Sequence, residues 1–131
     1  MLAAELVISI ICVGRTLMSE RQSDSSIFQS KLHQLGGKFI ERTRIEMAMM
    51  ATQIDAACGG DSAAAEQVLL LAHRINGTAA MLGFAGVSEP ARAIEQLLRD
   101  GTLTLNKWRV VERYFSTLQL AVMEAEESLA V

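Results

Sequence analysis

The 131-residue sequence contains few residues that break helices and few cysteines that could cross-link a small fold. It has one proline, nine glycines and two cysteines, and only 5% of it is aromatic. Because helix breakers are few and Ala, Leu, Met, Glu, Gln and Arg favour helix, the composition predicts a helical protein. Half of the residues are hydrophobic, which is enough for one core of aliphatic side chains at a length typical of a single domain.

Charge and cysteine usage exclude several classes of function. A net charge of −3 leaves no basic stripe of the kind that binds nucleic acid. Cys12 and Cys58 stand alone, without CxxC or Cys/His spacing, so we interpret them as buried thiols of a reducing compartment. We therefore expect a cytoplasmic protein with no metal site and no cofactor.

The first residues form a separate problem. Leu2 to Gly14 is mostly apolar, but it is too short to cross a bilayer and is interrupted by Glu5. No positive segment precedes it, which makes it a poor signal peptide. We expect residues 1–22 to be an N-terminal arm or extra helix and residues 23–131 to be the folded domain. Membrane attachment is the less favoured alternative.

Apolar residues recur at steps of three and four through most of the chain, and no segment alternates as a strand does. Glycine pairs, Asp61 or Ser62, and Pro90 after Ser88 supply the expected helix ends. The expected helices are a short one over 27–35, ending at Gly36-Gly37, and longer ones over 39–57, 63–82, 88–99 and from 104–106 onward. The prediction is an all-α antiparallel four-helix bundle with an additional short N-terminal helix or arm.

His73 lies on the helix expected over residues 63–82, on the side away from the core. At about 100° per residue, the apolar positions of this helix gather on one face, and His73 points roughly opposite to it. Gly77 and Ala80 share the face of His73 and leave space beside the imidazole. Leu69, Leu70 and Phe84 border this face, which predicts an apolar docking patch around the ring.

An exposed imidazole beside free space suits nucleophilic chemistry. A large fraction of an ordinary histidine is neutral near pH 7, and a neutral ring nitrogen can attack phosphorus. The plainer alternative is a surface histidine next to a chance glycine, and spacing alone favours that alternative.

The remaining candidates are better explained by structure than by function. His33 has no second ligand nearby and is expected at the surface. Three methionines are expected to fill gaps in the core: Met47, Met49 and Met50. Arg92, Glu95 and Arg99 are expected to form exposed pairs along one helix.

A string around the histidine resembles a known signature. Residues 71–80 read Leu-Ala-His-Arg-Ile-Asn-Gly-Thr-Ala-Ala, and Gly83-Phe84 and a helix over 88–98 follow. This resembles the A-H-x-L-K-G-x-A-x-x-x-G pattern of histidine-containing phosphotransfer (HPt) domains. The similarity is sharpest over residues 65–100 and extends loosely from Phe28 to the C-terminus.

The resemblance implies a four-helix bundle with His73 as the phosphoaccepting residue and Gly77 as the glycine that admits a partner. It implies a cytoplasmic, monomeric phosphocarrier that has no nucleotide-dependent catalysis of its own. Its expected partners are the receiver domains of hybrid histidine kinases and response regulators, docking over Leu69, Leu70, Ala80 and Phe84. The alternative is a helical module that binds such domains without accepting phosphate.

One position departs from the family pattern. The family usually has lysine three residues after the histidine, and this chain has Asn76. An amide donates hydrogen bonds but brings no charge to a phosphoryl group. Arg74, on the adjoining flank of the helix, is the substitute cation that the sequence offers.

Overall fold

The structure, a computed structural model, describes residues 20–130, with side chains from residue 25 onward. Within these residues it contains four helices and no strand: α2 (Glu20–Cys58), α3 (Ser62–Leu82), α4 (Ala85–Arg99) and α5 (Leu105–Leu129). The predicted all-α four-helix bundle is confirmed.

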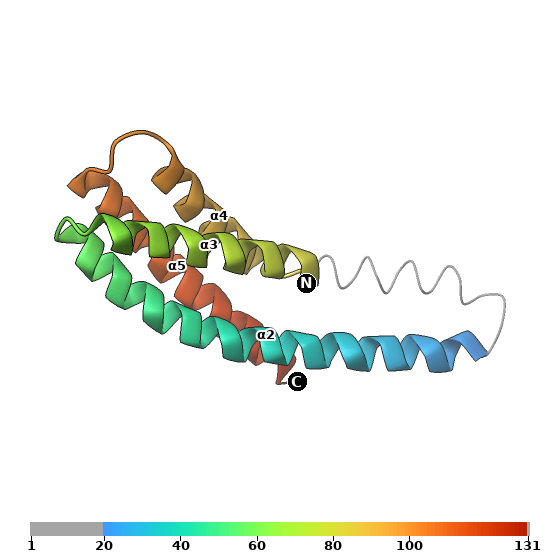
Figure 1. Cartoon of the computed structure of the whole chain (residues 1–131). Helices are drawn as coiled ribbons and strands as arrows, with labels where there is room; N and C mark the ends of the chain where they lie inside the picture. The colour runs from blue at the N-terminus through green and yellow to red at the C-terminus, as the bar shows by residue number, and fades with distance from the viewer. Residues whose placement is uncertain (1–19, 131) are drawn as a thin grey trace.

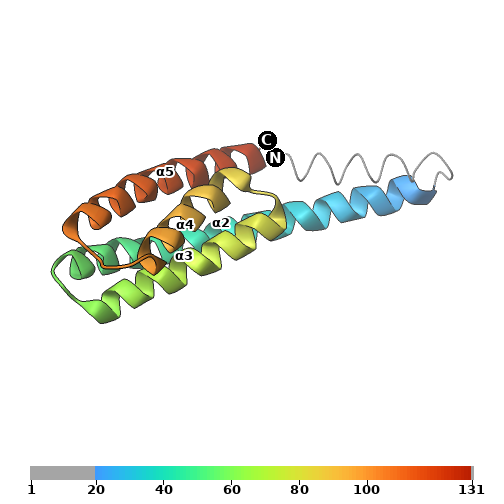
Figure 2. The same cartoon turned by 90° about the horizontal axis from the view of Figure 1, so that it is seen from above.

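The four helices run antiparallel in chain order, and each packs against the next (Figures 1 and 2). The last helix, α5, also packs against α2, which closes the bundle. Two of the three methionines expected in the core, Met47 and Met50, are buried, whereas Met49 is half exposed. The largest fully buried side chains are Met50, Ile75, Ile94, Leu118, Val68, Val87 and Val111 together with Thr43.

Side chains and a glycine fix the ends of α3 and the start of α5. The Asp61 carboxylate accepts a hydrogen bond from the backbone N–H of Ala64 at 3.1 Å, and Thr104 Oγ1 accepts one from Lys107 at 3.2 Å. Such caps satisfy N–H groups that have no partner within the helix. Gly83 ends α3 with φ of 84°, a left-handed conformation that glycine adopts without strain.

Helix α4 begins earlier than the sequence suggested. We expected its start at Ser88, but the helix begins at Ala85, and its N-cap, Phe84, makes no side-chain capping bond. Ser88 instead donates its hydroxyl to the carbonyl of Ala85 at 3.2 Å. Ser88 two residues before Pro90 is typical of a helix start, but here α4 begins at Ala85, directly after the turn at Gly83 and Phe84.

The expected break at Gly36-Gly37 was wrong, because α2 runs through both glycines as one helix. A side chain at Gly36 would meet Leu129 Cδ2 and Phe84 Cζ at 3.3 Å. The absence of a side chain at Gly36 therefore allows α2, the end of α5 and the α3–α4 link to pack closely. At Gly37 an added Cβ would meet nothing within 4 Å.

The N-terminal part of α2 extends past the other three helices (Figure 1). Ile27, Phe28 and Leu35 on this part are about half exposed. The expected N-terminal arm, residues 1–22, falls almost wholly outside the described residues. Among residues 20–130, none of the helices is both long enough and apolar enough to cross a membrane.

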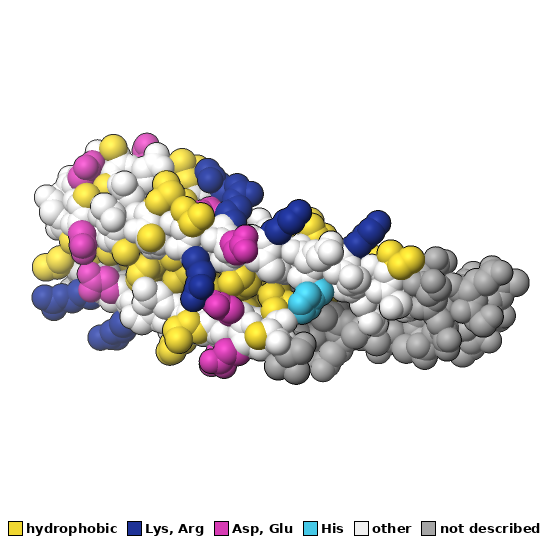
Figure 3. Space-filling model, turned by 90° about the horizontal axis from the view of Figure 1, so that it is seen from below, with side chains coloured by type: hydrophobic (Ala, Val, Ile, Leu, Met, Phe, Trp, Pro, Cys, Tyr) yellow, Lys and Arg dark blue, Asp and Glu magenta, His cyan; other side chains and the backbone are white. Residues whose placement is uncertain are grey.

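The surface carries charges of both signs. On the face shown in Figure 3, basic and acidic side chains lie interspersed with apolar ones and form no stripe of one sign.

Candidate functional site

His73 lies in the middle of α3 and projects away from the bundle interior. Its side chain is 63% exposed. The opposite face of α3 is buried in the core and is formed by Val68, Leu71, Ala72, Ile75 and Ala79. Burial of this stripe fixes the rotation of the helix about its axis, which directs the imidazole outward.

The imidazole is held by a carboxylate from the neighbouring helix. His73 Nδ1 lies 2.8 Å from Glu95 Oε2, and Glu95 belongs to α4. The same oxygen accepts from Arg99 Nε at 3.1 Å and lies 2.9 Å from Arg99 Nη2. The other carboxylate oxygen accepts a long hydrogen bond of 3.5 Å from Asn76 Nδ2.

This environment keeps Glu95 ionised. Burial alone raises the pKa of its carboxyl, but hydrogen bonds from His73, Arg99 and Asn76 outweigh that effect, and the pKa lies below its usual value. An ionised carboxylate only accepts hydrogen bonds, so Nδ1 of His73 must carry the proton between them. In the neutral ring, Nε2 then keeps its lone pair and points away from Glu95.

The sequence did not predict the contact between Glu95 and His73. We expected Arg92, Glu95 and Arg99 to form exposed pairs, but Glu95 is only 9% exposed and faces His73. Arg99 does pair with it at i,i+4, as expected. The spacing on α4 therefore indicated the ion pair between Glu95 and Arg99. It did not indicate that α3 packs beside α4 and brings His73, 22 positions away in the sequence, to the same oxygen of Glu95.

The two polar residues expected to support the ring point in different directions. Asn76 faces Glu95, on the α4 side of His73. Arg74 faces α2, where its Nη1 lies 3.8 Å from Glu46 Oε2. Among the described residues, no charged side chain of α3 forms an ion pair with His73, and the charges beside the ring are the Glu95 carboxylate and the Arg99 guanidinium bound to it.

Gly77 leaves the space beside His73 open. An added Cβ at Gly77 would meet nothing within 4 Å. The glycine lies about 40° from His73 around the helix, on the side toward α2. Glu95, Asn76 and Arg99 occupy the side toward α4. The open approach to the ring therefore lies toward α2.

The residues expected to form the apolar patch differ in exposure. Leu70 is 51% exposed and Ala80 is exposed, whereas Leu69 is half-buried against the core. The ring of Phe84 stacks on Phe39 with centroids 5.5 Å apart, so it packs against α2 and leaves only part of its surface open. Met81, which the sequence pattern did not single out, is 80% exposed.

Other titratable residues lie away from this site. His33 is exposed, as expected. Cys58 is half-buried rather than buried, and burial, followed by the negative charges of Glu112 and Asp55, raises the pKa of its thiol. Cys12 lies outside the described residues. In the described part of the chain, no group of three or more His, Cys, Asp or Glu side chains is arranged to hold a metal ion.

Chemically, the site presents one nucleophilic nitrogen on a rigid helix, with a fixed tautomer and an open approach. It has no second nucleophile, oxyanion hole or general acid among the residues that contact the ring. Such a site is suited to receiving a group that a partner brings.

Comparisons with known proteins agree with this geometry. A family model described as "Hpt domain" matches residues 34–127, which is more than half of the chain. The match covers all of α3 and α4 and most of α2 and α5. No curated protein showed a significant match to the chain, and no solved structure did.

Proposed function

The chain belongs to the Hpt domain family, and from this premise we propose that His73 is its phosphoaccepting residue. Hpt domains are phosphocarriers of phosphorelay signalling that interact with receiver domains of two-component systems. Our proposal is that a receiver-domain aspartate gives its phosphoryl group to His73, and that His73 passes the group to a second receiver domain.

The observation that carries the proposal is the oriented and accessible ring. His73 is 63% exposed, its Nδ1 is fixed by Glu95 at 2.8 Å, and the position of Gly77 beside it is open. A residue with only a structural role would gain nothing from a free Nε2 and an empty flank.

The proposed transfer of the phosphoryl group to His73 requires no proton transfer. The Nε2 lone pair attacks phosphorus, the N–P bond forms, and the P–O bond to the aspartyl carboxylate breaks with its electron pair leaving on that carboxylate. The ring, which keeps the proton on Nδ1, becomes a phosphoimidazolium. Its positive charge lies against the Glu95 carboxylate, which stabilises it. Onward transfer reverses these bond changes, and neutral imidazole is the leaving group.

We propose that the receiver docks over Leu70 and Ala80, together with the open parts of Leu69 and Phe84. Both Leu70 and Ala80 lie within two turns of His73 on α3 and are exposed. Gly77 provides clearance for the phosphoaspartate. Asn76 acts through Glu95, to which it donates a hydrogen bond.

The test of this proposal is labelling of His73→Gln. Wild-type protein should acquire acid-labile, base-stable phosphate from receiver domains that have been charged with acetyl phosphate, and His73→Gln should acquire none. His33→Gln is the matched control, because His33 is exposed on α2, outside the matched segment. Circular dichroism should show the same helical content in all three proteins. Acid-labile phosphate on His73→Gln would refute the assignment.

A second function, binding to signalling domains without accepting phosphate, is favoured by one observation. Asn76 is uncharged and Arg74 pairs with Glu46 on α2, so a phosphoryl group on Nε2 gains no cation from α3. Under this alternative, receivers should bind His73→Ala as tightly as wild type, and wild type should acquire no label. Under phosphotransfer, wild type acquires label that His73→Ala lacks.

A further inference from the structure

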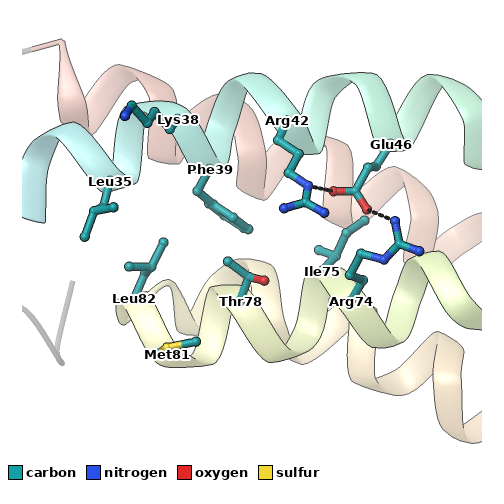
Figure 4. Close-up of a pocket in the computed structure, with 10 residues that line it drawn as sticks. All are labelled: Leu35, Lys38, Phe39, Arg42, Glu46, Arg74, Ile75, Thr78, Met81 and Leu82. Atoms are coloured by element: carbon teal, nitrogen blue, oxygen red, sulfur yellow. Dashed lines mark ion pairs between the residues drawn. The ribbon is translucent and has the colours of Figure 1, made fainter.

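A groove runs between α2 and α3 beside the histidine. It encloses about 320 Å³. Its floor is apolar, formed by Phe39, Ile75 and Leu82, and Leu35 and Met81 stand at its open end (Figure 4). Of these, Met81 is 80% exposed and Leu35 is 51% exposed, so part of the apolar surface is in water.

The polar rim of the groove is mainly basic. Arg42 from α2 and Arg74 from α3 converge on Glu46, with distances of 3.2 Å and 3.8 Å (Figure 4). Glu46 is only 8% exposed, whereas the side chains of Arg42 and Arg74 are 66% and 54% exposed. Lys38 is also exposed and forms no ion pair among the described residues. An approaching molecule therefore meets three cations and one shielded carboxylate.

The groove lies on the same side of α3 as Gly77, and Arg74 and Met81 of α3 line it, whereas His73 and Gly77 do not. Around α3, Gly77 lies about 40° from His73, Met81 about 80° and Arg74 about 100°, all toward α2. Since Gly77 has no side chain and an added Cβ there would meet nothing within 4 Å, the surface of α3 between the ring and the groove is open at this position. The other flank is filled by Glu95 and its partners.

We propose that the receiver domain approaches His73 from the α2 side, and that the groove holds an apolar side chain from an acidic segment of that receiver. The inference rests on the proposed function and adds the direction of approach and the chemistry of the contact. The occupant is one apolar side chain flanked by Asp or Glu, close to the phosphorylated aspartate of the receiver.

Two physical effects support this occupant over a basic or purely apolar one. Burying Met81 and Leu35 against an apolar side chain removes exposed hydrocarbon from water. Acidic flanks would face Lys38, Arg42 and Arg74, and charge complementarity of this kind raises association rates and discriminates between partners. A basic segment would face three like charges across the rim.

The test compares equal charge reversals on the two flanks. Lys38→Glu changes the groove, and Arg92→Glu makes the same change at an exposed position on α4. Lys38 and Arg92 have no role in the proposed phosphoryl chemistry. The probes are a panel of isolated receiver domains charged with acetyl phosphate. Phosphoramidate, which needs no docking surface, serves as the second phosphodonor.

We expect Lys38→Glu to slow transfer from receivers about fivefold at low ionic strength, and this loss should shrink in 0.5 M salt. Arg92→Glu should stay within about twofold of wild type. Met81→Gln, which keeps the length of the side chain but makes it polar, should slow transfer about threefold at all salt concentrations. All variants should be labelled by phosphoramidate at the wild-type rate.

The outcomes separate this inference from the proposed function. Equal losses in Lys38→Glu and Arg92→Glu, or a loss in Arg92→Glu alone, would overturn the approach from the α2 side. Wild-type transfer rates in Lys38→Glu and Met81→Gln would overturn the groove as a contact while leaving His73 as the acceptor. Absence of label on wild type from every receiver and from phosphoramidate would overturn the proposed function, and this inference with it.

Discussion

Replacing Glu95 with glutamine should slow phosphorylation of His73 while leaving the ring in place. Glutamine has nearly the same shape as glutamate, and its side-chain carbonyl can accept the hydrogen bond that Nδ1 of His73 donates at 2.8 Å. The tautomer and the direction of Nε2 should therefore persist. What is lost is the negative charge, which stabilises the positive charge that develops on the ring when Nε2 attacks phosphorus.

The size of the effect follows from the distance and the exposure. Unit charges about 4 Å apart attract by about 1 kcal/mol in water and about 4 kcal/mol in a partly buried site. The His73 side chain is 63% exposed, and Arg99 already neutralises part of the charge on the shared oxygen. Both facts favour the lower end of the range, near 1 kcal/mol. We therefore expect a rate about five- to tenfold below that of wild type.

The assay is single-turnover labelling with phosphoramidate, which avoids any effect on docking. Glu89→Gln, at an exposed position on the same helix, is the matched control and should label at the wild-type rate. Glu95→Ala, which loses both the charge and the acceptor, should be slower than Glu95→Gln. If Glu95→Gln is labelled at the rate of Glu89→Gln, the charge of Glu95 has no role in the reaction. If Glu95→Ala is also labelled at that rate, Glu95 has no role in orienting the His73 ring either.

Four further outcomes follow from contacts described above. Asn76→Lys should lengthen the lifetime of phosphohistidine severalfold, measured as decay of label, because it brings a cation to the α3 side of the site. Gly77→Ala should raise the free energy of unfolding by up to about 1 kcal/mol, measured with urea, because it adds a helix-favouring methyl group in open space. Gly36→Leu should lower that free energy by about 1–3 kcal/mol through overpacking, whereas Gly37→Ala should raise it slightly. Finally, the lowered pKa of Glu95 contributes stability that is complete above its unfolded value of 4.5 and is lost as the pH falls through the lower folded pKa. Urea midpoints between pH 7 and pH 3 should thus fall less steeply for Glu95→Gln than for wild type.

The sequence predicted the features that depend on one helix at a time. The apolar stripe of α3 predicts an outward direction for His73, and its side chain is 63% exposed. Asp61 was named as a candidate cap, and its carboxylate binds the first turn of α3. Such features follow from the helical repeat and from local capping, and both can be read from neighbouring residues.

The features that the sequence did not predict depend on how two helices meet. Glu95 lies between two arginines on α4, a pattern that is equally typical of a solvated helix face. Only the packing of α3 on α4 buries it beside His73. The same holds for Gly36, whose neighbour Gly37 makes the pair look like a helix end. Contacts with Leu129 and Phe84 give it a packing role instead.

The link between α3 and α4 has a consequence for the dynamics of the site. The backbone N–H of Phe84 binds the carbonyl of Ala79 at 2.8 Å, and Gly83 adopts its left-handed conformation between them. This turn sets the register of α4 along α3, and a slip by one residue would carry Glu95 about 1.5 Å along the helix axis and rotate it away from Nδ1. A shift of α4 at this turn would therefore weaken the hydrogen bond that orients Nδ1 of His73. Hydrogen exchange at the backbone amide of Phe84 would report how often this turn opens.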